Sequence, residues 1–271
     1  MSTHTGVGER FELRAGQAFA EVGTVAAVLC ALRVGDVDLT EPLPQDVAPP
    51  PFCSGIALAP WPNRVRAGRW SLDGAVQQLD ITEPTRGGAL HGLLEFTEYE
   101  VRERSDAAIT LGAVIHPQHG WPFLLDTWVR FELAPDGLSV THGARNLSER
   151  RAPYATGTHP YPRVGTADVA DLVLTVPADE YLEVDERLDP IRWLPVEGVP
   201  TYAAGCAWAN SRSTPRSADS GPTATSPRPS RPPTARVSRS GSRTTGATCR
   251  CSRRRSSRGA AASAPRSRSS R

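Results

Sequence analysis

Short apolar segments separated by turn residues run from Phe11 to about Thr201, and none keeps the 3.6-residue period of a helix. The clearest pair lies at 124–147, where apolar and polar side chains alternate and Pro135-Asp136-Gly137 separates the two halves. Alternation places one strand face in a core, and this triplet has the chemistry of a tight turn. The pattern predicts an antiparallel hairpin whose first strand buries alternate residues: Leu125, Thr127, Val129, Phe131 and Leu133.

Two further segments have strand character. Ala26–Leu39 is broken at Gly35-Asp36, which predicts two strands joined by a tight turn, and Leu172–Val176 is a separate strand candidate. The Pro-rich stretch Glu41–Pro51 predicts an extended loop. Many short strands with turns about every ten residues favour an all-β sandwich or barrel over alternating strands and helices.

Charge divides the chain into two unlike parts. Residues 1–204 carry 16 Arg and 28 acidic residues, a net charge of −12, whereas residues 205–271 carry 15 Arg and one acidic residue, a net charge of +14. After Tyr202 no Leu, Ile, Phe, Met or Tyr occurs. We therefore predict a β domain over 1–204 and a tail over 205–271 that cannot build a core.

Several protein classes are disfavoured by composition. No stretch approaches the roughly 20 apolar residues of a membrane span, and the first residues lack a basic region followed by an apolar core. The five cysteines are odd in number and have no CxxC spacing, which argues against a zinc site or a disulfide framework. We expect a soluble cytoplasmic protein with no metal site.

Three polar clusters interrupt the β pattern: Pro60–Arg64 followed by Gly68–Trp70, His91-Gly92, and His159–Tyr161. Each alone is a weak signal, because a single histidine near Gly or Pro is more often a surface or loop-packing residue. In this order and spacing they resemble the aldose 1-epimerase (galactose mutarotase-like) family, which carries PWPNR, a Gly-Arg-Tyr/Trp hairpin, a His-Gly and a His-x-Tyr. The resemblance covers the first 204 residues.

The resemblance implies a large antiparallel β-sandwich of the galactose mutarotase type, and acid/base ring opening of a reducing sugar without a cofactor. His159 would be the acid, since an imidazole with a pKa of about 6.5 readily gains and loses a proton near neutral pH. His91 would lie beside the ring oxygen. Arg64 would bind sugar hydroxyls, Asn63 would form the turn that aims it, and Tyr161 would complete the substrate-binding set.

Two family segments are missing after Tyr202: the Leu-Asp-x-Ala-Phe segment and the Glu-Pro-Met-Thr segment that carries the general base. We therefore expect the sandwich to be incomplete at its C-terminal end. One possible coding sequence for residues 205–217, read in the frame that starts at its third base, encodes Met-Arg-Leu-Gly-Glu-Leu-Ala-Leu-Asp-Thr-Ala-Phe. In the same shifted frame, possible codons for residues 266–271 encode Val-Glu-Val-Glu-Pro-Met. Possible codons for residues 248–252 encode Leu-Gln-Val-Phe in that frame.

These readings predict a frameshift near residues 203–205 and, without the general base, little or no mutarotase activity. Two alternatives stay open. A non-catalytic carbohydrate-binding protein would keep the same polar residues without proton transfer. A nucleic-acid-binding basic arm is disfavoured, because such arms normally carry Lys and seldom begin where a β domain is unfinished.

Overall fold

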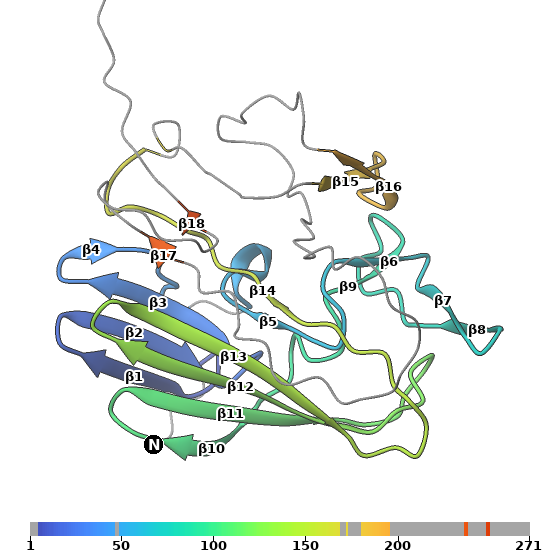
Figure 1. Ribbon diagram of the computed structural model, residues 1–271, viewed down its shortest axis with the longest axis horizontal. Coiled ribbons are helices and arrows are strands. Elements are labelled where there is room, and N and C mark those ends of the chain that lie inside the picture. Colours follow the sequence, from blue (N-terminus) through green and yellow to red (C-terminus); the bar gives the residue numbers. More distant parts are fainter. Residues whose placement is uncertain are drawn as a thin grey trace, which may run out of the picture.

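A computed structural model describes residues 5–46, 49–168, 172, 180–195, 236–237 and 248–249. Two four-stranded antiparallel sheets form most of this structure (Figure 1). The first sheet contains β1 (Arg10–Ala15), β2 (Ala18–Gly23), β3 (Val28–Val34) and β4 (Val37–Asp38), in that order. The second contains β10 (Glu100–Arg104), β11 (Ala108–Ile115), β12 (Leu125–Ala134) and β13 (Gly137–Asn146).

Smaller strand pairs stand beside these sheets. The antiparallel pairs are β5 (Ala57–Leu58) with β14 (Gly157–Thr158), β6 (Arg64–Arg66) with β9 (Gly88–Leu90), β7 (Arg69–Leu72) with β8 (Ala75–Gln78), and β15 (Glu180–Val184) with β16 (Pro190–Pro195). The short strands β17 (Arg236–Val237) and β18 (Thr248–Cys249) pair in parallel. Among the described residues, the only helical element is a 3-10 turn at Pro51–Cys53.

The hairpin predicted from alternation is confirmed. β12 and β13 pair from Leu125↔Asn146 to Ala134↔Gly137, and every second residue of β12 is buried. The interrupted segment 26–39 is confirmed as β3 and β4, joined through a turn in which Gly35 has a φ of 56°. The strand candidate at 172–176 lies outside the described residues, apart from 172.

The core lies between the two large sheets. Leu13 on β1, Ile109 on β11 and Phe131 on β12 are at most 2% exposed and belong to one apolar cluster. Because both sheets contribute inward side chains to this cluster, they pack face to face as two layers (Figure 1). The predicted all-β sandwich is therefore confirmed.

One edge of the second sheet is densely charged. β10 ends the strand order, and all five of its residues are exposed, four of them being charged: Glu100, Arg102, Glu103 and Arg104. Charged side chains on an edge strand oppose the addition of a further strand.

An aromatic cluster attaches the β6–β9 region to the sandwich. The ring centres of Trp61 and Trp70 lie 5.7 and 5.8 Å from that of the buried Trp121. The indole nitrogen of Trp70 also donates to the carbonyl of Gly120 at 2.9 Å. The tilted aromatic packing and the hydrogen bond from the Trp70 indole fix the β7–β8 hairpin relative to the core. Within the described part of the chain, no helix has the length and apolar character needed to cross a membrane.

Candidate functional site

Three short pairings bring distant parts of the chain to one place. The β6–β9 register sets Arg64 opposite Leu90, so that His91 directly follows β9 beside the start of β6. The β5–β14 pair ends at Thr158, so that His159 emerges next to β5. A parallel bridge between Ala59 and Gly92 joins the two pairs. A Cβ at Gly92 would overlap the Ala59 carbonyl, so this close approach requires glycine.

Asn63 and His91 hold each other through reciprocal bonds. The backbone N–H of His91 donates to the Asn63 carbonyl at 3.0 Å, and the backbone N–H of Asn63 donates to His91 Nδ1 at 3.1 Å. Both residues have positive φ, 62° for Asn63 and 59° for His91. Such strain persists where surrounding contacts impose it, often at functional sites. Since Nδ1 accepts this hydrogen bond, neutral His91 carries its hydrogen on Nε2 and can donate a hydrogen bond from there.

The two predicted catalytic histidines are in contact. The ring centres of His91 and His159 lie 5.2 Å apart with an interplanar angle of 80°. Tyr161 stacks on His159, with the two ring centres 5.6 Å apart and an interplanar angle of 29°. The Tyr161 hydroxyl donates to the carbonyl of Phe52 at 3.2 Å, which anchors the stack to the 3-10 turn. His159 Nδ1 is buried without a hydrogen-bond partner among the described residues.

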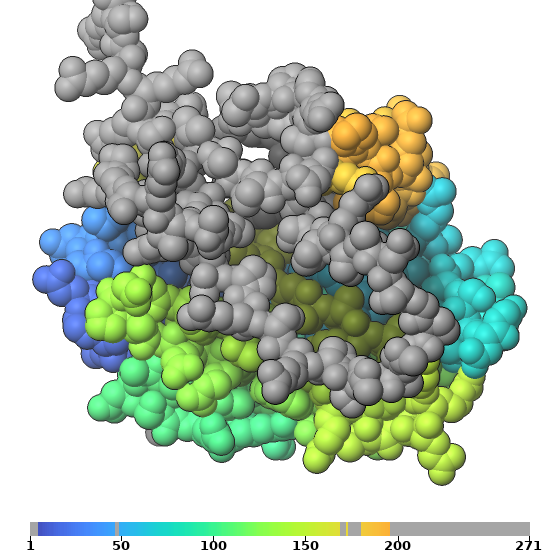
Figure 2. Space-filling view, in the orientation of Figure 1, coloured from blue at the N-terminus to red at the C-terminus, as the bar shows by residue number. Residues whose placement is uncertain are grey.

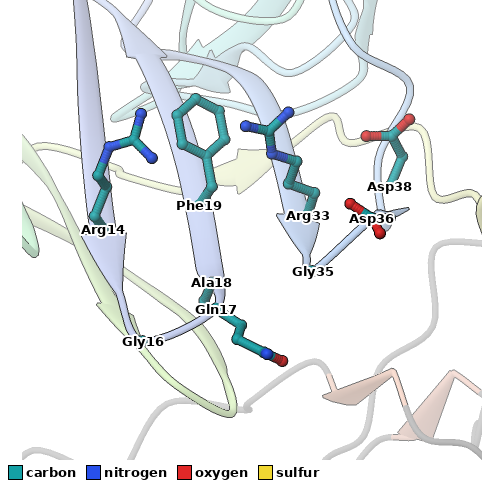
Figure 3. A pocket seen from close by; sticks show the side chains of 9 residues that line it. All are labelled: Arg14, Gly16, Gln17, Ala18, Phe19, Arg33, Gly35, Asp36 and Asp38. Atoms are coloured by element: carbon teal, nitrogen blue, oxygen red, sulfur yellow. The ribbon is translucent and has the colours of Figure 1, made fainter.

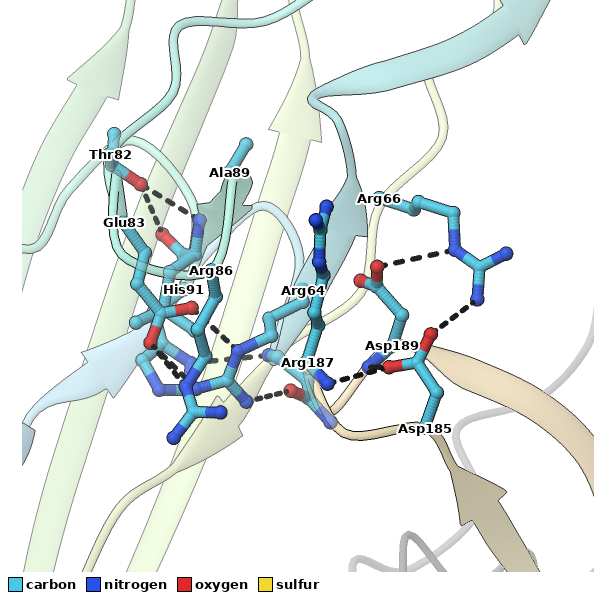
Figure 4. Close-up of polar contacts among 12 residues, drawn as sticks. Arg64, Arg66, Thr82, Glu83, Arg86, Ala89, His91, Asp185, Arg187 and Asp189 are labelled. Carbon is cyan, nitrogen blue, oxygen red and sulfur yellow. Dashed lines mark hydrogen bonds and ion pairs between the residues drawn. The ribbon is translucent and has the colours of Figure 1, made fainter.

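Arg64 lies beside this pair within a network of charges (Figure 4). Its Nε and Nη2 donate to the two carboxylate oxygens of Glu83 at 2.6 and 2.9 Å, and its Nη1 donates to Asn63 Oδ1 at 3.1 Å. Arg86 adds a second contact to Glu83 at 3.3 Å. The structure therefore brings together all five sequence-predicted site residues: Asn63, Arg64, His91, His159 and Tyr161.

Burial and neighbouring charge set the protonation of this cluster. Burial, followed by the charges of His159 and Arg64, lowers the pKa of His91 to about 4, while Glu83 acts in the opposite direction. Burial also lowers the pKa of His159. The hydrogen bonds from Arg64 hold the pKa of Glu83 below its usual value. At neutral pH, the site therefore holds a neutral His91 beside a tightly paired Arg64 and Glu83.

Lowered histidine pKa values predict acid sensitivity of the fold. Burial lowers the pKa of His142 to about 4 as well. Burial lowers the pKa of His159 too, so below about pH 6.5 the unfolded chain binds protons at His91, His142 and His159 that the folded chain does not bind. The free energy of unfolding should therefore fall as pH drops from 6.5 toward 4, with a slope approaching about 1.4 kcal/mol per pH unit for each histidine.

Urea unfolding between pH 7 and 5 measures this slope. His142→Asn should reduce it, because one of the three contributing groups is removed. His119→Gln is the control, since the His119 side chain is 86% exposed, and it should keep the full slope. An unchanged slope in His142→Asn would contradict the assignment.

The β15–β16 hairpin is tied to this region by Arg66. Its Nη2 and Nε lie 3.2 Å from carboxylate oxygens of Asp185 and Asp189, respectively (Figure 4). Arg86 Nη1 also donates to the carbonyl of Glu186 at 3.5 Å. In Figure 2, the orange atoms of the hairpin accordingly lie against the cyan atoms of the β6–β9 region.

A separate cavity of about 420 Å³ lies at the turn ends of the first sheet (Figure 3). The guanidinium carbons of Arg14 and Arg33 lie 5.0 and 4.3 Å from the centre of the Phe19 ring there. None of the predicted site residues lines this cavity. Across the described residues, no group of three His, Cys, Asp or Glu side chains is arranged to hold a metal ion.

Sequence reasoning missed Glu83, Cys53 and Glu95. Glu83 pairs with Arg64, and the Cys53 thiol donates to Glu95 Oε1 at 3.2 Å. Burial, followed by the charge and the hydrogen bond of Glu95, raises the pKa of Cys53 to about 12, so the thiol is protonated and unreactive at neutral pH. Cys53 ends the 3-10 turn and the two glutamates lie in loops, none with a periodic pattern, so only the fold reveals their proximity.

Comparisons with known proteins point to one family. The sequence profile of the aldose 1-epimerase family matches residues 11–202. Uncharacterized protein YihR of Escherichia coli K12 is 34% identical over 184 residues, covering 68% of this chain and 59% of that protein. Galactose mutarotase of Rattus norvegicus is 28% identical over 212 residues, covering 71% and 59% respectively.

A solved structure shows the same fold. A galactose mutarotase-like protein from Clostridium acetobutylicum superposes with a TM-score of 0.62 at 18% identity, covering 70% of this chain and 62% of that one. The chain thus spans about three fifths of the length of the relatives it matches. Because the family profile matches most of the chain, and its motifs meet in one place on the sandwich, the chain belongs to the aldose 1-epimerase family.

Proposed function

We propose that the site interconverts the α and β anomers of a hexose by acid/base ring opening, and that the chain as written does so weakly or not at all. The observation that carries the proposal is the contact between His91 and His159, with their ring centres 5.2 Å apart beside Arg64. In this proposal the protein acts in the cytoplasm on a small-molecule sugar without a bound cofactor.

The two histidines have different roles in the proposed reaction. His91 is neutral at neutral pH and has its hydrogen on Nε2, so it donates a hydrogen bond that orients the ring oxygen. His159 transfers the proton to the ring oxygen as the ring opens. Burial lowers its pKa, which makes its protonated form a stronger acid but reduces the share of that form at neutral pH.

Arg64 and Tyr161 bind the sugar in this proposal. Arg64 donates charge-assisted hydrogen bonds to hydroxyl groups. Tyr161 is 38% exposed and stacks on His159, so it limits the orientations of that imidazole and offers a ring face to the substrate. Both residues therefore hold the substrate in a reactive orientation and do not exchange protons with it.

The missing step is removal of the anomeric hydroxyl proton. The residues after 202 lack the Glu-Pro-Met-Thr segment that supplies the base in the family. The family match ends at residue 202, directly before the proposed frameshift at 203–205, which supports the shifted reading. Resequencing this part of the gene tests it, and an unambiguous read with no restoring insertion or deletion would count against a sequencing error.

Polarimetry of freshly dissolved α-D-glucose and α-D-galactose tests the activity. The full chain should barely accelerate the change in rotation, whereas a chain whose codons after 203 follow the restored phase should accelerate it clearly. Sugar binding by calorimetry without acceleration in either protein would instead favour a non-catalytic carbohydrate-binding protein. Absence of both binding and acceleration would overturn the proposal.

A further inference from the structure

The Arg64–Glu83 pair is shielded and bidentate. The side chains are only 15% and 17% exposed, and two parallel N–H···O bonds of 2.6 and 2.9 Å join them. Bidentate pairing of a guanidinium with a carboxylate fixes the plane of the guanidinium as well as its position. Arg64 therefore has one defined orientation relative to His91.

The loop that carries Glu83 is itself rigid. The Thr82 hydroxyl accepts the backbone N–H of Leu90 at 2.8 Å, which ties the loop to the end of β9. The Glu83 backbone N–H donates to the carbonyl of Gly88 at 3.0 Å, and the Glu83 carbonyl accepts the N–H of Gly87 at 2.8 Å. The backbone that carries the Glu83 side chain is thus restrained by bonds on both sides of the loop.

Pairing leaves Arg64 with a defined set of free donors. A guanidinium has five N–H groups. In Arg64, two of these groups donate to Glu83 and one donates to Asn63. The other two N–H groups make no hydrogen bond to the residues that the structure describes. A substrate hydroxyl therefore meets a preoriented donor edge instead of a mobile side chain, and binding loses less side-chain entropy.

We propose that Glu83 is a positioning residue that orients Arg64 and balances the charge beside His91, so that the two remaining Arg64 N–H groups bind a hydroxyl of the substrate. This inference rests on the proposed sugar-binding function. Glu83 acts through Arg64 and is assigned no proton transfer. The groups that set the charge at His91 are His159, Arg64 and Glu83.

The test compares the full chain with Glu83→Gln, Glu83→Asp and the matched control Glu103→Gln. Glu103 also pairs with an arginine, Arg130, at 3.1 Å, but on the second sheet with its side chain 71% exposed. Calorimetry with D-galactose and D-glucose should show binding weakened by about tenfold or more in Glu83→Gln. Partial recovery is expected in Glu83→Asp, and no change in the control.

A second measurement does not require sugar. NMR of the Arg64 Nε–H group should show slow hydrogen exchange in the full chain and faster exchange in Glu83→Gln, and the His91 pKa should fall further in that variant. The control should move neither signal. Unchanged exchange and an unchanged His91 titration in Glu83→Gln would overturn the positioning role.

The two measurements separate the two proposals. If neither the full chain nor the control binds sugar, the proposed function fails, and with it the role in substrate binding. The NMR signals then still decide whether Glu83 orients Arg64. If sugar binds equally to the full chain and to Glu83→Gln, the function stands and the positioning role is overturned.

Discussion

Replacing His159 by alanine in a chain with the restored reading phase should slow anomer exchange by on the order of 10²- to 10⁴-fold, the usual contribution of a general acid. His91 cannot substitute for it. Burial keeps the pKa of His91 at about 4, and its Nδ1 accepts the Asn63 backbone N–H, so at neutral pH it is a neutral imidazole that offers a hydrogen bond from Nε2 and is not an imidazolium acid. Polarimetry with an excess of α-D-galactose measures the loss.

The control for this experiment is His119→Ala, because His119 is exposed and lies outside the site. It should retain the full rate. The rate of the His159 variant should also lose the pH dependence that titration of this imidazole imposes. Full activity in His159→Ala would refute the role as acid, and the proton would then have to come from another group.

Replacing Phe131 by alanine should lower the free energy of unfolding by about 3–5 kcal/mol. Phe131 lies in the centre of β12, is 2% exposed, and is paired in register with Ile109 and Val140. Its removal leaves a cavity between two sheets that cannot close without moving strands on both sides. Urea unfolding followed by tryptophan fluorescence measures the change.

Phe96→Ala is the matched control, since it removes the same side chain at a position that is 69% exposed. The control should change the free energy of unfolding by no more than about 0.5 kcal/mol. Equal effects at the two positions would mean that the two sheets do not share a core at Phe131.

Parts of the fold follow from local patterns. The β12–β13 hairpin could be predicted because its alternation is regular and its turn chemistry is unambiguous. The break between β3 and β4 could be predicted from Gly35-Asp36. The facing of the two sheets could not be derived from periodicity, because it depends on an apolar cluster shared by distant residues such as Leu13 and Phe131, which no local pattern connects.

The site was only partly predictable for the same reason. His91 and His159 were picked out by a family resemblance, whereas their contact results from the β5–β14 and β6–β9 pairings. The partner of Arg64 was not foreseen. Glu83 stands in a non-periodic loop between Thr82 and Pro84, where a carboxylate would ordinarily be expected to face water.

The charged β10 strand affects how this protein behaves when it is concentrated or partly unfolded. Another chain pairing along this rim would have to strip water from several ionised side chains at once. Amyloid-like lengthening of the sheet is therefore disfavoured on this side.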